Sequence, residues 1–366
     1  MTDSNESKVV KDVLLTDFRP KCQLRVERHQ PQRPKFPTID AHNHLFGAEP
    51  AEHIVEVMDQ VGVDLWLNVS GNVTMPLVNN TYTIARQDFE IFKRDYIDRF
   101  PGRFAAFTMS EFAQWGDPVL FQNDFVKRCL GGLEKDVALG AAGLKVTKEL
   151  GLAFTDADGS MVRVDDERLY PIWDRAGQLD LPVLIHISDP TAFFDPIDAQ
   201  NEHYQTLHEF PGWSFVGSHF SKDELLVQRN RMIADHPGTT FILPHVANKA
   251  EDLASVGRLL DEYSNIIIDF SARIDELGRQ PYTARNFFIK YQDRILFGVD
   301  MPVSPEVYRT YFQLLETRDE WFDYPDYIGR FGVYTRWKLY GLDLPDDVLR
   351  KVYSENVRRL IAGLPG

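Results

Sequence analysis

Two histidines separated by one residue, His42 and His44, close a short and mainly apolar segment at residues 36–41. If this segment is a β-strand, the two side chains point to the same side, because side chains alternate along a strand. Neutral imidazole is a common ligand of zinc and similar cations. The spacing therefore indicates that both histidines bind one metal ion from the same side. The alternative is that they are ordinary core histidines.

Further polar side chains close further short apolar segments. They are Lys145, His186, His245 and Asp300. Singly, each has an ordinary explanation as a core histidine, a helix-capping aspartate or a lysine that reaches solvent. If the segments are neighbouring parallel strands, however, their carboxyl ends meet on one side of the fold. The repetition therefore indicates one shared functional site.

The segments that carry these residues belong to a regular series in which short β-branched runs alternate with longer helical patterns. The predicted strands are residues 37–42, 64–70, 103–109, 141–147, 182–188, 240–246, 265–271 and 294–300. Nearly continuous apolar character is typical of parallel strands buried on both faces. Eight strands alternating with helices predict an α/β fold of the (β/α)8, or TIM, barrel type.

Helices and long loops fill the intervals. The predicted helices are residues 50–61, 81–100, 118–138, 166–179, 222–236, 249–263 and 281–291, with further helices from residue 306 and over 346–361. Residues 148–165, 189–221 and 301–345 exceed ordinary connections and follow the fourth, fifth and eighth predicted strands. Because barrels build their active sites on that side, we expect these three loops to shape a pocket.

Composition limits the domain organisation and the partners. Residues 1–35 are mixed in charge and rich in proline and are expected to form an N-terminal arm, whereas residues 36–366 are predicted to form a single barrel domain. A formal net charge of −15 disfavours nucleic acid and anionic membranes as partners, but not a small acidic substrate.

The sequence contains no recognisable targeting segment and only two cysteines. The polar N-terminus lacks the apolar core of a signal peptide, and no apolar stretch has the length of a membrane span, so a cytoplasmic protein is expected. Cys22 and Cys129 have no CxxC partner and are expected to be reduced thiols.

The strand-end residues carry a resemblance to a known family. The run Ile39-Asp-Ala-His-Asn-His-Leu, the single histidines on the fifth and sixth predicted strands and the ending Leu296-Phe-Gly-Val-Asp-Met-Pro resemble the amidohydrolase superfamily. Within it they resemble the amidohydrolase-related branch, which includes aminocarboxymuconate semialdehyde decarboxylase and metal-dependent lactonases. The resemblance spans residues 36–362. Members of this branch are often homodimers, so a homodimer is expected.

The resemblance implies a metal site and a mechanism. His42, His44, His186 and Asp300 would bind one divalent metal ion, zinc in the first place and manganese as an alternative. His245 would lie beside the ion as an unligated general acid and base, and Asp300 would share in proton transfer. Such an ion lowers the pKa of a water molecule from about 15.7 to about 7 and so activates it for attack on a carbonyl group.

Lys145 and Arg273 have more than one interpretation. With a single metal ion, Lys145 is assigned to substrate binding. In two-metal relatives a lysine at the end of the fourth strand is carboxylated and bridges the ions, so a binuclear site is the alternative. Arg273 follows the seventh predicted strand and could bind a substrate carboxylate through its planar guanidinium. An ion pair of Arg273 with Asp275 or Glu276 is the alternative.

Residues of the long loop after the fifth strand could shape the pocket. Trp213 is assigned to substrate binding, with Asp189 and His219 as further pocket residues. No role is assigned to the histidines on other predicted loops and helices, which are His53, His203, His208 and His236. Aromatic residues of this loop and of residues 301–345 could instead mark a dimer contact.

Two reactions fit the predicted site. The first is metal-dependent hydrolysis of an ester or lactone, an amide or a carbon–carbon bond next to a carbonyl, in a small substrate that is cyclic or acidic. The second is nonoxidative decarboxylation of a small unsaturated or aromatic acid. Many decarboxylases of the branch have glutamate or a similar residue in place of His42, which favours hydrolysis modestly, because the semialdehyde decarboxylase keeps both histidines. A non-catalytic barrel would be expected to lack part of the ligand set.

Overall fold

The fold was established from a computed structural model. It describes residues 12–364 except 15–16, 19, 48, 79–80, 115–117, 325–336 and 362, with the backbone alone at 77–78 and 81–82. At the centre of the described chain lie eight parallel strands. They are β1 (Thr38–Asn43), β2 (Val63–Asn68), β7 (Phe104–Ala106), β8 (Leu144–Val146), β9 (Val183–Ile185), β10 (Phe241–Leu243), β11 (Ile266–Asp269) and β12 (Ile295–Leu296).

The eight strands form a closed ring. Their ladders give two sheets, with the orders β1-β2-β7 and β12-β11-β10-β9-β8. Backbone hydrogen bonds join both pairs of sheet edges, since the amide of Lys145 donates to the carbonyl of Thr108 over 2.7 Å and that of Asp300 to His42 over 2.8 Å. The predicted (β/α)8 barrel is confirmed. None of the observed strands is longer than the segment predicted for it.

Two apolar layers explain why the strands read as continuous apolar runs. One layer fills the ring and includes Ile39, Leu67, Leu184, Ile242 and Ile267, which are all buried. The other lies between the strands and the surrounding helices. Because successive side chains of each strand enter one layer or the other, both faces of every strand leave water.

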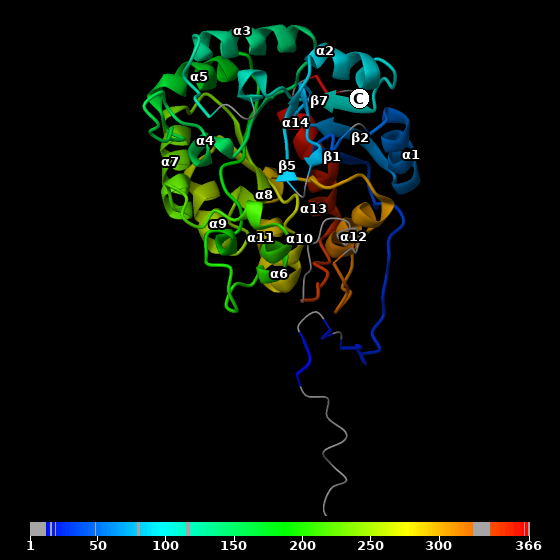
Figure 1. The fold of residues 1–366 in the computed structure, drawn as a ribbon. Coiled ribbons are helices and arrows are strands. Elements are labelled where there is room, and N and C mark those ends of the chain that lie inside the picture. Colours follow the sequence, from blue (N-terminus) through cyan, green and yellow to red (C-terminus); the bar gives the residue numbers. More distant parts are fainter. Residues whose placement is uncertain are drawn as a thin grey trace, which may run out of the picture.

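Helices surround the ring (Figure 1). The longer ones are α1 (Ala51–Val61), α3 (Phe125–Ala138), α5 (Tyr170–Gln178), α7 (Lys222–Asp235), α9 (Leu253–Glu262), α11 (Pro281–Lys290) and α12 (Pro305–Glu316). Shorter ones are α2 (Phe89–Phe92), α4 (Glu149–Leu152), α6 (Tyr204–Glu209), α8 (Pro244–Ala247), α10 (Ile274–Arg279), α13 (Asp346–Arg350) and α14 (Asn356–Leu360). Helix α7 begins with a capping box, in which Ser221 and Glu224 bind each other's backbone amides.

The prediction of a helix over residues 81–100 is wrong in its first half. Residues 81–86 form β5 (Thr81–Tyr82) and β6 (Ala85–Arg86), which pair with β4 (Leu77–Val78) and β3 (Val73–Thr74). The run Thr81-Tyr-Thr-Ile is β-branched and aromatic, a composition that favours extended backbone. The helix begins only at Phe89 and continues as a π-helix over Lys93–Ile97.

The described part of the N-terminal arm lies on the outside of the barrel, past α1 and α12 (Figure 1). His29 Nδ1 is 2.6 Å from Asp319 Oδ1, and the Lys35 amide donates to Glu316 Oε1 over 3.0 Å. Of the two free thiols, Cys22 is exposed and Cys129 is buried. Among the residues described, no helix is both long and apolar enough to cross a membrane.

Candidate active site

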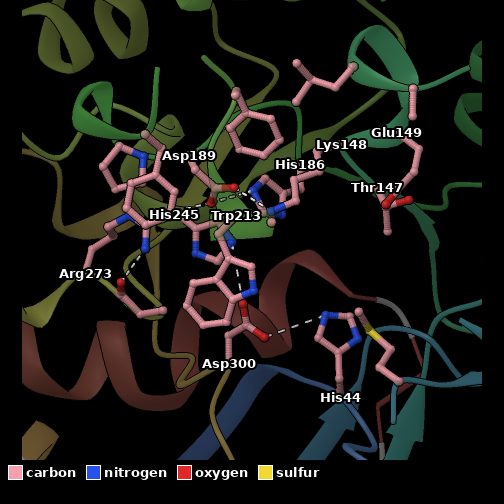
Figure 2. Close-up of a pocket in the computed structure, with 18 of the residues that line it drawn as sticks. His44, Thr147, Lys148, Glu149, His186, Asp189, Trp213, His245, Arg273 and Asp300 are labelled. Atoms are coloured by element: carbon pink, nitrogen blue, oxygen red, sulfur yellow. Dashed lines mark hydrogen bonds and ion pairs between the residues drawn. The ribbon is translucent and has the colours of Figure 1, made fainter. Parts of the chain in front are cut away.

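Three histidines converge on Asp300 where the strands end. The Nε2 atoms of His42 and His245 lie 3.8 and 3.6 Å from Asp300 Oδ2, and His44 Nε2 lies 3.7 Å from Asp300 Oδ1. In Figure 2 a dashed line joins Asp300 to His44. His42, His44 and Asp300 place their ligand atoms within 4.8 Å of one another, an arrangement that could hold a metal ion.

Hydrogen bonds orient all three rings in the same sense. His42 Nδ1 lies 2.8 Å from a carboxylate oxygen of Asp269, and His245 Nδ1 lies 2.8 Å from the carbonyl of Ser271. His44 Nδ1 lies 2.6 Å from Ser70 Oγ. Carboxylates and carbonyls only accept, which assigns the proton of His42 and His245 to Nδ1 and leaves a lone pair on Nε2 facing Asp300.

His186 does not join this group. Its Nε2 donates to the carbonyl of Ser188 over 2.9 Å, so this ring carries its proton on Nε2, unlike His42 and His245. Its ring nevertheless packs against His245, with centroids 4.5 Å apart. The structure therefore brings His42, His44, His245 and Asp300 together. The role of His186 as a metal ligand stays a prediction, and in this orientation the ring would have to bind the metal through Nδ1.

The backbone at the strand ends is strained. His245, Ala272 and Asp300 have φ of 58°, 50° and 51°, in the left-handed region that residues with a Cβ atom seldom occupy. A left-handed turn continues from His245 to Asn248, and Arg229 Nη1 donates to the Ala247 carbonyl in this turn over 2.7 Å. These sharp turns aim the side chains into the mouth of the barrel and end the strand ladders early.

Burial sets the charge of the site. It lowers the pKa of His245 well below the usual range and that of His186 to about 4, so both rings are neutral at pH 7. Burial also lowers the pKa of Lys145 to about 8 and raises that of Asp300. Neutral imidazole is the form that binds a metal ion.

The donor set fits a divalent cation. His42 Nε2 and His245 Nε2 are buried and have no hydrogen-bond partner among the described residues. Each is a lone-pair donor beside the partly buried carboxylate of Asp300, and a buried polar atom without a partner is unfavourable. The contact of His42 with Asp269 repeats the carboxylate–histidine arrangement that orients metal-binding imidazoles in proteins.

A cavity of about 690 Å³ opens above this group. His44, Lys145, His186, His245 and Asp300 contribute to its lining. Apolar walls come from the three long loops and neighbouring segments, in particular Phe46, Met75, Phe154, Phe193, Phe215 and Tyr324. The predicted loops therefore line a pocket, as far as the chain is described.

The structure places two of the three pocket residues predicted from the loop after β9 in the lining of the cavity. Asp189 and Trp213 line the cavity (Figure 2). His219 is not among its lining residues. Arg273 also lines it, and its guanidinium lies 3.3 Å from Asp189 Oδ1, while Lys148 Nζ lies 2.5 Å from Asp189 Oδ2. The ion pair of Arg273 is thus with Asp189, and within the described chain neither Asp275 nor Glu276 lies close enough to Arg273 to form one.

Two groups of residues were missed in the sequence. His203, to which no role was assigned, lines the cavity together with Asp275 and Glu276, and burial and the neighbouring Asp275 raise the pKa of Glu276 well above its usual range. His203 lies in a loop, where no strand-end position marks it. Asp269, the partner of His42, could have been found, since it ends the apolar run Ile266-Ile-Ile.

Comparison with known proteins defines the class. Among solved structures, an uncharacterised TIM-barrel protein from Bordetella bronchiseptica superposes with a TM-score of 0.51 at 16% identity, over 89% of this chain and 98% of the other. A dihydroxybenzoic acid decarboxylase from Polaromonas sp. JS666, with bound manganese and the inhibitor 2-nitroresorcinol, gives 0.52 at 16%, over 88% and 96%. The 4-oxalomesaconate hydratase of Rhodopseudomonas palustris gives 0.50 at 15%, over 88% and 95%.

At these identities the structural likeness establishes a shared barrel fold and nothing about the reaction. The family is established by sequence, because the amidohydrolase family model matches residues 39–362. The chain belongs to the amidohydrolase family, as the strand-end residues predicted. No curated protein matches it.

Proposed function

We propose that this protein is a metal-dependent hydrolase that cleaves a carbonyl-type bond, an ester or lactone, an amide or a carbon–carbon bond, in a small cyclic or acidic substrate. The observation that carries the proposal is the convergence of the Nε2 atoms of His42, His44 and His245 on Asp300, at 3.6 to 3.8 Å, beside the cavity. Ligand sets of this composition suit zinc, and one ion is proposed for this site around Asp300.

In this proposal His42, His44 and Asp300 hold the ion, with His186 as the predicted fourth ligand. A bound zinc ion supplies a Lewis acid that polarises a carbonyl group and makes a water molecule acidic near pH 7. His245 is neutral and keeps its proton on Nδ1, where the Ser271 carbonyl accepts it. Its Nε2 can therefore take a proton from the attacking water and return it to the leaving group.

The remaining polar residues of the cavity are proposed to position the substrate. Lys145 Nζ is buried without a hydrogen-bond partner in the described chain, so a substrate oxygen would satisfy it. Arg273 would bind an acidic group of the substrate in exchange for part of its contact with Asp189. Trp213 and the aromatic walls would pack on a ring or an unsaturated chain.

Decarboxylation is the second candidate. It is supported by the cationic side chains Lys145 and Arg273 in the cavity lining, which could hold a carboxylate. Decarboxylases of dihydroxybenzoic acid also share the barrel fold, which shows that this fold can carry such a reaction.

A substrate screen in ¹⁸O-labelled water separates the two reactions. Lactones, amides, 1,3-diketone acids and unsaturated or aromatic acids would be incubated with the metal-loaded protein, and products analysed by mass spectrometry and for released carbon dioxide. Hydrolysis predicts one ¹⁸O atom in the product carboxyl group and no carbon dioxide. Release of carbon dioxide without incorporation of the label would replace the hydrolase proposal by the decarboxylase.

The state of the protein in solution is part of the proposal. A homodimer is expected, and light scattering after size-exclusion chromatography would give about twice the chain mass of 42.2 kDa. A mass of one chain would contradict it. A cytoplasmic location stays a prediction from the sequence.

A further inference from the structure

A second group of buried metal-type ligands lines the same cavity. His203 precedes α6 in the loop after β9, and Asp275 and Glu276 lie in the first turn of α10 after β11. One ligand atom from each of the three lies within 4.8 Å of the others. Exposed fractions are 6% for His203, 6% for Asp275 and 3% for Glu276, so little water reaches these side chains.

Two polar atoms of this group have no visible partner. His203 Nε2 and Glu276 Oε2 are buried and make no hydrogen bond to any described residue. His203 Nε2 lies 3.9 Å from Glu276 Oε1, which is too long for a hydrogen bond. Ligand atoms that are each about 2.1 Å from one ion lie about 3–4 Å apart, so this spacing suits two ligands of one cation.

The nearby arginines form their ion pairs with other carboxylates and attract Asp275 and Glu276 only at longer range. Arg273 pairs with Asp189, and Arg279 pairs with Glu202 over 2.9 Å. No described lysine or arginine forms an ion pair with the carboxylates of Asp275 and Glu276. Two adjacent buried carboxylates repel each other unless a proton or a cation lies with them.

We propose that His203, Asp275 and Glu276 form a second divalent-cation site, for zinc or manganese, in the wall of the cavity. It shares no residue with the group around Asp300, and it differs from a binuclear centre bridged by Lys145, which would lie at the strand ends. The ligand set of one imidazole and two carboxylates suits either ion. A cation at this position would give the cavity a second point of attraction for an acidic substrate.

Metal counting tests the proposal on the full-length protein. Metal-free protein would be dialysed against micromolar zinc or manganese and the bound metal measured by mass spectrometry. Wild-type protein and Lys145→Met are expected to bind two ions per chain. His203→Gln and Glu276→Gln are expected to lose the second ion and keep the one beside Asp300. His42→Gln is expected to lose the ion beside Asp300 and keep the second one. Glu56→Gln, an exposed glutamate of α1, is the matched control and should bind two.

The variants separate the possible outcomes. One ion per chain in wild-type protein would overturn the proposal, and so would two ions in both His203→Gln and Glu276→Gln. Loss of the second ion in Lys145→Met alone would assign it to a lysine-bridged centre instead. His203 and Glu276 lie on different elements. Loss of the second ion in both variants would therefore not be explained by misfolding of one element.

Anomalous diffraction from wild-type crystals grown with manganese gives a measurement that needs no variant. A peak beside His203 and Glu276, in addition to one beside Asp300, is expected. A peak beside Asp300 alone would contradict the second site while leaving the proposed hydrolase intact.

Discussion

His42 Nδ1 lies 2.8 Å from Asp269 Oδ2, and both side chains are buried. Burial alone would raise the pKa of Asp269, but His42 and Ser271 outweigh it and lower the pKa, so the carboxylate stays ionised. This anion holds the proton of His42 on Nδ1 and directs the Nε2 lone pair towards Asp300. The end of β11 thus sets the chemistry of a residue on β1.

Replacing this carboxylate should weaken metal binding. Asp269→Asn keeps the size of the side chain but removes its charge, and loss of such a supporting partner typically lowers metal affinity about 10–100-fold. Competition with a chromophoric chelator would measure the affinity. Asp64→Asn, at an exposed position of β2, is the control and should behave as wild type. Unchanged affinity in Asp269→Asn would show that Asp269 does not support a metal ligand.

His245 and His186 should respond differently to substitution. His245→Asn is expected to retain metal, because His42, His44 and Asp300 remain, and to lose about 10²–10⁴-fold in kcat, because the proton acceptor is gone. His186→Asn is expected to lose metal affinity. Metal content and turnover of both variants give the test. Loss of metal in His245→Asn with retention in His186→Asn would exchange the two roles.

Trp213 should contribute to substrate binding. It lines the cavity and stacks on Phe210, with ring centroids 4.4 Å apart. Trp213→Ala removes about 1.5–3 kcal/mol of apolar contact if the substrate covers the indole, which predicts a KM about 10–100-fold higher. Trp213→Phe should recover part of the loss. An unchanged KM in Trp213→Ala would exclude Trp213 from the binding site.

Glu251 connects the two ends of the loop that carries Trp213. Its Oε1 accepts from Lys222 Nζ over 2.5 Å and from the Thr191 amide over 3.0 Å. Lys222 is 6% exposed, so removal of its partner leaves a buried charge. Glu251→Gln is expected to lower the free energy of unfolding by about 1–3 kcal/mol at pH 7, measured by urea denaturation.

The effect of Glu251→Gln should depend on pH. Burial would raise the pKa of Glu251, but Lys222 and Thr191 outweigh it and lower the pKa to about 2, from 4.5 for an unperturbed glutamate. A lowered carboxylate pKa stabilises the folded state above the unfolded-state pKa and ceases to do so as pH falls through the folded-state pKa. The difference in free energy of unfolding between variant and wild type should therefore be constant from pH 7 to about 5 and shrink as the pH falls from about 4.5 towards 2. A difference that does not change down to pH 3 would contradict this role.

The ion pair is also limited at alkaline pH. Burial lowers the pKa of Lys222, so Lys222 loses its charge, and the pair is lost, at a lower pH than for an exposed lysine.

The barrel could be predicted because its strands leave a strong signal in the sequence. Runs such as Ile266-Ile-Ile are buried on both faces, and helices separate them at regular intervals. The segment at residues 81–86 could not be separated from the helix that follows it, because its extended form depends on pairing with two other short segments, Val73–Thr74 and Leu77–Val78. Its β-branched residues gave only a weak local preference.

The site was predictable where a residue ends a strand and not where a loop brings it in. His42 lies on β1, and His245 and Asp300 follow shortly after β10 and β12, so all three could be predicted from the apolar runs that precede them. His203 reaches the cavity through a long loop, whose path depends on contacts such as Asn201 Nδ2 to the Ala192 carbonyl at 2.7 Å. The orientation of His186 depends on the Ser188 carbonyl, which the sequence does not place.

Metal removal and replacement test the central claim most directly. Protein stripped with a chelator and dialysed would be assayed on the substrate found in the screen, before and after addition of zinc in steps of a fraction of an equivalent. The account predicts no hydrolysis without metal and a linear return of activity that is complete when the site around Asp300 is filled, with His42→Gln inactive throughout. Full activity of the stripped protein, or of His42→Gln, would contradict it.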